Sequence, residues 1–293
     1  MIPALLVLSV AMSLTNTTSR KFFARDHLKT NGDNLAFTLG TQFLSMLVLF
    51  FFGNPFRVSL YTLFLALMMG VDQVFSSVTY VKALTTGPVS LTSLFLQGMT
   101  LIISSLVGPL FFMEVLSIPQ IVGMLLVLVA MVLITDLKQD KSISVNWLLL
   151  MLLNGVLGGL QGFFQKVLSK SPYADETTPF VFWTFCFSCI VTAVCLLFQS
   201  RNLKKEYITI RPKGFVLIAV ILCALTSAGL NIVNLFLVAA LPTAVFFPLV
   251  TCSILLLNAV IGIVFFKERL SKRQIAGFSL GIVALMLTAG VFG

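Results

Sequence analysis

One acidic residue lies deep inside an apolar segment of this sequence. Asp72 occurs in LMMGVDQVFSSVTYV, whereas the other nine acids lie in polar loops or near the ends of segments. A carboxylate near the centre of a bilayer costs at least ~2.5–3.5 kcal/mol, so it normally faces protein or water. Ser76 and Tyr80 follow at i+4 and i+8 on the same helical face, and Gln73 flanks that face. The stripe predicts the wall of a cavity that binds a substrate.

A later apolar segment, residues 213–238, carries two asparagine amides and no acidic residue. Asn231 and Asn234 are three residues apart, and at an offset of 154 residues they align with Ser77 and Tyr80. The two segments therefore predict one anionic wall and one amide wall. The alternative is that these amides join helices through interhelical hydrogen bonds, which average about 0.6 kcal/mol in membranes.

Other polar and aromatic residues are weaker candidates for the same site. Asn16 aligns with Gln161 at an offset of 145, but it falls near the end of its segment, where capping or interfacial exposure would explain it. Gln42 and Gln97 are lone amides within apolar segments. Trp183, in PFVFWTFCF, could offer a ring face to a cation, with a place at the membrane interface as the alternative.

The composition gives little support to other kinds of chemistry. His27 is the only histidine, and the five cysteines form no spaced ligand set with it, so we expect no metal, no cofactor and no catalytic residue. The sequence has no G-x-x-x-x-G-K-[ST] motif, which excludes ATP use through a P-loop. The net charge of +9 lies in short loops between apolar segments, a pattern typical of membrane proteins and not of nucleic-acid binding.

The segments that carry these residues are long and apolar. Of the 293 residues, 58% are hydrophobic and only 10% are charged; a soluble domain has roughly 25% charged residues. Ten segments are each near the ~20 residues that cross a bilayer. We therefore predict an all-α integral membrane protein with ten transmembrane helices, over residues 2–19, 34–52, 58–81, 88–113, 118–136, 146–168, 178–199, 213–238, 242–266 and 272–292.

The second half of the chain repeats the first. Residues 88–135 align with 242–289 without a gap, and 15 of the 48 positions are identical. Glu114 matches Glu268, and both look like helix-end anchors that pair with lysine or backbone groups. Five spans per half make the second half enter the membrane in the opposite sense. We therefore predict two inverted five-helix repeats, residues 1–140 and 141–293.

The two repeated segments resemble the drug/metabolite transporter superfamily, specifically its EamA-type ten-helix members. Each starts at a proline and continues through an apolar span to F-F-x-E or F-F-K-E-R, then Leu-Ser, Gln, Gly and a last apolar span. The resemblance implies two EamA-like repeats in a fold whose members move small metabolites, including amino acids, nucleotide sugars and choline. It does not select the substrate, and it implies cytoplasmic termini.

Loop charge predicts the opposite orientation. The odd-numbered loops, which include residues 20–33, 200–212 and 267–273, carry 16 basic residues, and the other side carries 3. By the positive-inside rule the odd-numbered loops are cytoplasmic and both termini lie outside. We expect a multi-pass protein of the cell membrane.

The sequence thus predicts a secondary active transporter of a small polar metabolite that works by alternating access. An amino acid, an amine or another cationic solute would suit Asp72, and coupling to protons is an open alternative. We expect the substrate and membrane lipid as partners, no nucleic acid, and either a monomer or a homodimer. A non-transporting receptor or subunit is the main alternative function. An intramembrane enzyme is disfavoured, because one buried acid and one loop histidine make no catalytic set.

Overall fold

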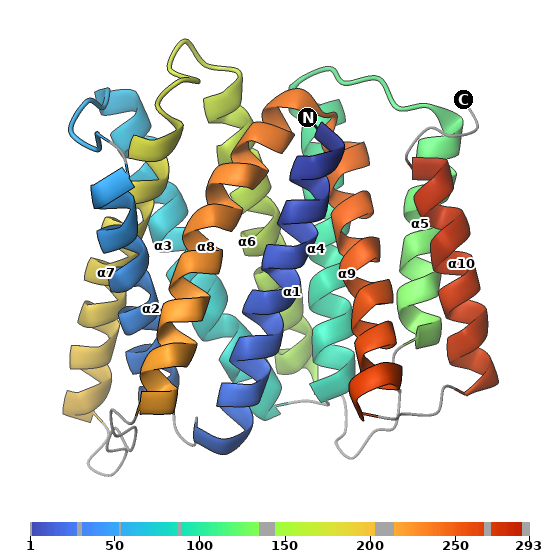
Figure 1. The fold of residues 1–293 in the computed structure, drawn as a ribbon, viewed down its shortest axis with the longest axis horizontal. Helices are drawn as coiled ribbons and strands as arrows, with labels where there is room; N and C mark the ends of the chain where they lie inside the picture. The colour runs from blue at the N-terminus through green and yellow to red at the C-terminus, as the bar shows by residue number, and fades with distance from the viewer. Residues whose placement is uncertain are drawn as a thin grey trace. The chain divides into compact units, whose positions relative to one another are not determined.

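The computed structural model describes residues 2–27, 31–52, 54–86, 89–134, 144–202, 214–266 and 271–288. Within these ranges the chain is helical and contains no strand (Figure 1). Each helix in the described ranges overlaps one predicted segment, which confirms the all-α, ten-helix fold. The helices are α1 (Ile2–His27), α2 (Asn31–Phe52), α3 (Leu60–Thr86), α4 (Val89–Phe111), α5 (Ile118–Ile134), α6 (Val145–Ser169), α7 (Thr177–Asn202), α8 (Gly214–Ala240), α9 (Thr243–Phe266) and α10 (Lys272–Thr288).

Six of these helices are long and apolar enough over their described residues to cross a bilayer. These are α1, α2, α3, α6, α7 and α8, and shorter apolar segments occur in α4, α5 and α9. The 17 residues of α5 extend about 25 Å at 1.5 Å per residue, somewhat less than the ~30 Å hydrocarbon core of a bilayer. The chain is therefore a multi-pass membrane protein.

The first helix is longer than predicted. α1 continues to His27, so Asn16 lies in the helix interior and not near its end. The Thr15 hydroxyl donates to the Ala11 carbonyl four residues back, at 2.9 Å, which is a mid-helix arrangement. Capping of a helix end therefore does not explain Asn16, because the helix continues to His27.

The helices group into two compact units, and each unit combines helices from both halves of the sequence. Unit 1 comprises Met1–Val74 and Val167–Phe236, with α1, α2, α7, the first part of α3 and most of α8. Unit 2 comprises Phe75–Lys166 and Leu237–Gly293, with α4, α5, α9, α10 and most of α6. The division into repeats 1–140 and 141–293 concerns the sequence, and it stays a prediction.

Helices that correspond in the repeat pack against each other within the units. α2 packs on α7 in unit 1, and in unit 2 α4 packs on α9 and α5 on α10, the last pair side by side in Figure 1. The end of α4 meets the start of α9, where the Gly108 N–H donates to the Thr243 hydroxyl at 2.9 Å. The end of α5 meets the start of α10, where Gln274 donates to the Ile134 carbonyl at 3.2 Å. Both pairs are antiparallel, as inverted repeats require.

The serine and glutamine that recur in both repeated segments lie at the N-termini of α5 and α10. The Ser117 N–H before α5 donates to the Gln120 side-chain oxygen at 3.0 Å, and the Ser271 N–H before α10 donates to that of Gln274 at 2.9 Å. At α10 the Gln274 N–H also donates to the Ser271 hydroxyl at 3.3 Å, which completes a capping box. The repeated Leu-Ser-x-x-Gln pattern therefore has a structural explanation at both helix N-termini.

In unit 1, Glu176 ties the start of α3 to the start of α7. Ser59 caps α3 by accepting a hydrogen bond from the Thr62 N–H at 3.1 Å. The N–H and hydroxyl of Ser59 both donate to the Glu176 carboxylate, at 3.0 and 2.9 Å. Burial alone would raise the pKa of Glu176, but hydrogen bonds from Thr62 and Ser59 stabilise its charged form and lower the pKa below its ordinary value of 4.5.

We expect protonation of Glu176 to weaken this tie. Because the pKa is lower in the folded than in the unfolded state, the stabilisation is present above a pH of about 4.5 and is lost as pH falls through the folded-state pKa. Glu176→Gln should therefore melt below wild type at pH 7, and the difference should shrink in acid. Thermal unfolding in detergent across this pH range measures the effect. Asp175→Asn, at an exposed neighbouring acid, is the control, and a difference for Glu176→Gln that stays constant with pH would contradict the prediction.

Candidate substrate site

The predicted acidic residue lies in the middle of a membrane helix. Asp72 is 6% exposed and lies within the span Leu60–Tyr80 of α3. The helix continues without a break through Gln73, Ser76 and Tyr80, so the stripe keeps its predicted spacing. Asp72 and Gln73 belong to unit 1, whereas Ser76 and Tyr80 belong to unit 2. The stripe thus contributes two residues to each compact unit.

In unit 1, α3 approaches α7 closely at Gly70. A Cβ at this position would lie 2.9 Å from the Thr184 carbonyl oxygen and 3.0 Å from the Phe187 Cβ, so only glycine fits without a shift. Here the Ser188 hydroxyl lies 3.0 Å from the Gly70 carbonyl and 3.2 Å from Gln73 Oε1, and its single proton is shared between the two acceptors. The close approach at the glycine thus brings the predicted residue Gln73 against α7.

α7 carries a buried row of hydroxyl groups that escaped prediction. Thr184, Ser188 and Thr192 follow at i, i+4 and i+8, and each is at most 1% exposed. Thr192 donates to Gln42 Oε1 of α2 at 3.0 Å, whereas Thr184 bonds the Phe180 carbonyl of its own helix at 2.8 Å. The i+4 spacing of these hydroxyls is a signal present in the sequence, but the surrounding aromatic residues conceal it.

Polar side chains join α1 to α8 in unit 1. The Ser9 hydroxyl donates to Asn234 Oδ1 at 2.7 Å, and two turns along α1 the Asn16 amide lies 2.8 Å from the Ser227 hydroxyl. Asn231 donates to the Ser227 carbonyl of its own helix at 2.9 Å. The helix-joining alternative, stated for Asn231 and Asn234, agrees with the bond of Asn234, whereas Asn231 bonds its own helix. All three asparagines stay partly exposed, and their role in lining a cavity remains a prediction.

Of the two remaining predicted residues, Trp183 has side-chain contacts that the structure describes, and Gln97 does not. The Trp183 indole N–H donates to the Pro55 carbonyl at 2.9 Å, which holds the turn after α2. The Trp183 ring is edge-on to Phe182 and tilted against Phe187, with centroids 5.6 and 5.8 Å away. These contacts suit an anchor, and a cation site on the ring stays a prediction. The side chain of Gln97 lies outside the described part of the chain.

In unit 2, Asn154 of α6 bonds to the second part of the stripe on α3, and this residue also escaped prediction. Asn154 is 0% exposed, and its amide donates to the Ser76 carbonyl at 2.5 Å and to the Thr79 hydroxyl at 2.6 Å. At the repeat offset of 145, Asn154 corresponds to Ser9, which bonds α1 to α8. Both halves therefore place a helix-joining polar residue at the same position of their first helix.

A buried ion pair lies where α4, α6 and α9 meet in unit 2. Lys166 Nζ is 2.5 Å from Glu114 Oε1, and Lys166 is only 1% exposed. Lys166 also donates to the carbonyls of Val238 and Leu241, at 2.8 and 3.2 Å, at the end of α8. The second Glu114 oxygen accepts from the Thr243 N–H at 2.8 Å, at the start of α9. The predicted anchoring role of Glu114 is confirmed, with both lysine and backbone as partners.

The backbone after α4 directs Glu114 toward these partners. Met113 has a left-handed φ of 53°, and the Glu114 N–H donates back to the Gly108 carbonyl at 3.2 Å, which turns the chain sharply at the helix end. A left-handed non-glycine residue costs roughly 1–2 kcal/mol. A Cβ at Gly108 would overlap the Glu114 carboxylate and the Thr243 hydroxyl, so this position needs glycine. The repeat counterpart Glu268 lies outside the described residues.

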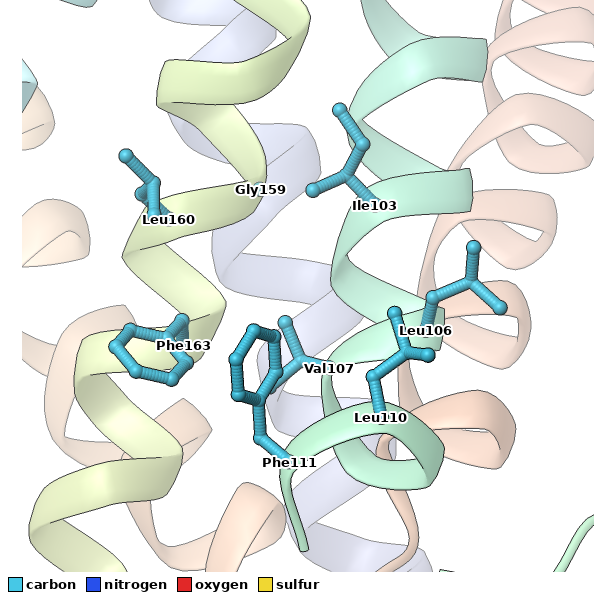
Figure 2. Close-up of a pocket in the computed structure, with 8 residues that line it drawn as sticks. All are labelled: Ile103, Leu106, Val107, Leu110, Phe111, Gly159, Leu160 and Phe163. Atoms are coloured by element: carbon cyan, nitrogen blue, oxygen red, sulfur yellow. The ribbon is translucent and has the colours of Figure 1, made fainter.

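An apolar cavity of about 220 Å³ lies between α4 and α6 in unit 2 (Figure 2). Phe111 of α4 faces Phe163 of α6, with ring centroids 5.1 Å apart at 63°. No described residue of the predicted site lines this cavity, and its side chains offer no hydrogen bond to a polar solute. It therefore does not match the predicted site. Its lining residues are Ile103, Leu106, Val107, Leu110, Phe111, Gly159, Leu160 and Phe163.

Comparisons with known proteins find a family match in the second half of the chain. The sequence model of the EamA-like transporter family matches residues 145–290. A crystal structure of another protein covers 98% of this chain and 99% of its own, with a TM-score of 0.72 and 14% identity, so the two share a fold. No curated protein matches the sequence. Residues 145–290 therefore carry an EamA-like transporter domain, which is consistent with the drug/metabolite transporter superfamily that the repeat predicted.

Proposed function

We propose that this chain is a secondary transporter that carries a small polar metabolite with an amino or other cationic group across the cell membrane by alternating access. The family match over residues 145–290 supports a membrane transporter of the drug/metabolite type. The observation that carries the finer proposal is the burial of Asp72, 6% exposed, in the middle of a membrane helix. A carboxylate in that place is costly, and a cationic substrate would offset its charge.

The same residue supports proton coupling as a second role. An intramembrane carboxylate can alternate between charged and neutral forms during a transport cycle, as acids in pumps and transporters do. In one role Asp72 pairs with the substrate, and in the other it carries the coupling proton. The pH dependence of transport by Asp72→Asn separates them: substrate pairing predicts loss of binding at every pH, and proton coupling predicts exchange without accumulation driven by a pH gradient.

A receptor or a subunit without transport activity is the alternative function. Such a protein needs no cavity that opens to both sides, whereas the polar residues of α3 and α8 occur at matched positions of the two sequence halves. The test is solute flux. Proteoliposomes that contain only the purified chain should take up substrate above the level of protein-free liposomes, and an unchanged level would favour the receptor.

The proposal includes an orientation with both termini outside. The 16-to-3 distribution of basic residues favours cytoplasmic odd-numbered loops. We expect Lys29→Cys and Lys204→Cys, in a cysteine-free background, to resist impermeant maleimide in whole cells and to react after the cells are opened. Both positions lie outside the described residues. Labelling of both positions from outside would show the reverse orientation.

A further inference from the structure

The cavity between α4 and α6 in unit 2 is an apolar groove with an open mouth. Its volume of about 220 Å³ exceeds that of the engineered cavity of about 150 Å³ that holds a benzene molecule. The Phe111 ring lies between the two helices (Figure 2), and Phe111 and Leu110 in the lining are 65% and 70% exposed. Every lining residue is apolar, so a water molecule or a polar solute in the groove would leave its hydrogen bonds unmade.

Glycines of α6 and two aromatic rings together shape the groove. A Cβ at Gly155 would overlap the Met99 side chain, and a Cβ at Gly159 would overlap that of Ile103, so these glycines let α6 approach α4 closely. Farther along both helices the rings of Phe111 and Phe163 are in edge contact, with centroids 5.1 Å apart. The space between them is not filled by other side chains of unit 2, so its walls lack the dispersion contacts of a packed interior.

The groove continues the lipid-facing side of α6. Leu160 and Phe163 of the groove extend a row of side chains at helical spacing that are 38–61% exposed. The polar residues Asn154 and Gln161 lie on the opposite side of the helix. Because α6 is long and apolar enough to cross the bilayer, its exposed row contacts acyl chains, and the groove is open to the same chains. We call this row the apolar face of α6; it consists of Leu149, Leu152, Leu153 and Val156.

The groove also lies at the depth of the acyl chains of one leaflet. α6 ends at Ser169, and at 1.5 Å per residue Phe163 and Gly159 lie about 9 and 15 Å before that end. One leaflet supplies about half of the ~30 Å hydrocarbon core. The groove therefore lies within the leaflet nearer the C-terminal end of α6, where a phospholipid places its chains.

We propose that this groove binds one acyl chain of a phospholipid from the surrounding bilayer. Acyl chains are as apolar as leucine, so the hydrophobic effect does not favour the groove over the bulk membrane. The gain comes from dispersion contacts, because the chain fills a space that packing within unit 2 leaves open. The inference requires only that the protein spans a membrane, and it does not rest on the proposed transport function.

The first test locates the acyl chain by photochemical labelling. The purified full-length chain is placed in vesicles of palmitoyl-oleoyl phosphatidylcholine, some of which carries a diazirine near the middle of one acyl chain. Light attaches that chain to the residues beside it, and mass spectrometry of peptides identifies them. We expect wild type to be labelled at Phe163 in the groove and at Leu152 on the apolar face of α6.

Two variants fill the groove, one from each wall. Leu110→Trp and Leu160→Trp should each lower labelling at Phe163 by about tenfold, equivalent to about 1.4 kcal/mol, and should change labelling at Leu152 less than twofold. Using both walls keeps the test decisive if one variant fails to fold. Leu153→Trp is the matched control, because it places the same ring on the apolar face of α6 outside the groove.

The second test measures stability in detergent with and without added phosphatidylcholine. Phe111 and Phe163 each precede a member of the buried Glu114–Lys166 pair by three residues, so a chain in the groove packs beside this junction. A lipid that binds only the folded state raises the melting temperature. Phosphatidylcholine should raise it in wild type and Leu153→Trp, and by less than about half as much in Leu110→Trp and Leu160→Trp.

The two readouts decide the proposal without reference to transport. Selective loss of labelling at Phe163 in the filled variants, together with their weaker response to lipid, supports the acyl-chain site. Labelling at Phe163 that neither variant lowers would indicate ordinary contact with bilayer lipid and would overturn the site. So would equal losses at Phe163 and Leu152, an effect of Leu153→Trp as large as that of Leu110→Trp, or equal responses to lipid in all variants.

Discussion

Lys166→Met should lower the melting temperature by roughly 10 °C. The change leaves the Glu114 carboxylate without its cation in a site where Lys166 is only 1% exposed, and it removes two hydrogen bonds to the end of α8. Removing one partner of a buried ion pair costs about 3–5 kcal/mol, and 1 kcal/mol corresponds to about 2–4 °C in a protein of this size range. Thermal unfolding in detergent at neutral pH measures the shift.

The double variant Glu114→Gln with Lys166→Met should recover most of this loss. A neutral glutamine can still accept the Thr243 N–H, and no uncompensated charge remains. Lys170→Met, at an exposed lysine just after α6, is the control. It should change the free energy of unfolding by no more than roughly 0.5 kcal/mol, which is typical of surface substitutions. Additive losses in the double variant would show that the pairing of Glu114 with Lys166 does not stabilise this site.

Gly70→Ala and Gly40→Ala should have effects of opposite sign. A Cβ at Gly70 would lie 2.9 Å from a backbone oxygen of α7, whereas one at Gly40 would meet only Val220 at an ordinary 3.7 Å. Overpacking costs about 1–3 kcal/mol, and replacement of a helical glycine by alanine gains up to about 1 kcal/mol. We expect the first variant to melt lower and to lose ligand binding, because it pushes Gln73 and Ser188 apart. Equal melting temperatures for the two variants would contradict the close approach of α3 to α7.

Helices and repeats were predictable from the sequence because they depend on local patterns. Apolar segments of bilayer length define the helices, and the gap-free repeat marks the counterparts that pack together. The repeated serine and glutamine encode helix N-terminal caps, which need only neighbouring residues. The length of α1 was missed because its polar residues resemble a helix end. The Thr15 hydroxyl bonds within the helix, and the amide of Asn16 bonds across to α8.

The partners of the polar residues were not predictable, because they come from distant parts of the chain. Nothing in the sequence near Gln42 points to Thr192, and nothing near Glu114 selects Lys166 over other lysines. The hydroxyl row of α7 was hidden for a different reason: serine and threonine can satisfy themselves on their own helix, as Thr184 does. Asp72 stood out because a charge inside an apolar span has no such local solution.

The most direct test of the transport function is counterflow into proteoliposomes by wild type and Asp72→Asn. Liposomes that contain only the purified chain are loaded with the amino acid or amine that raises its melting temperature most, and uptake of the same labelled compound is followed at several pH values. We expect saturable uptake by wild type, and for Asp72→Asn either no uptake at any pH or exchange that no longer responds to a pH gradient. Uptake by wild type no greater than in protein-free liposomes, or an Asp72→Asn variant with wild-type rate and pH dependence, would contradict a transport site built on Asp72.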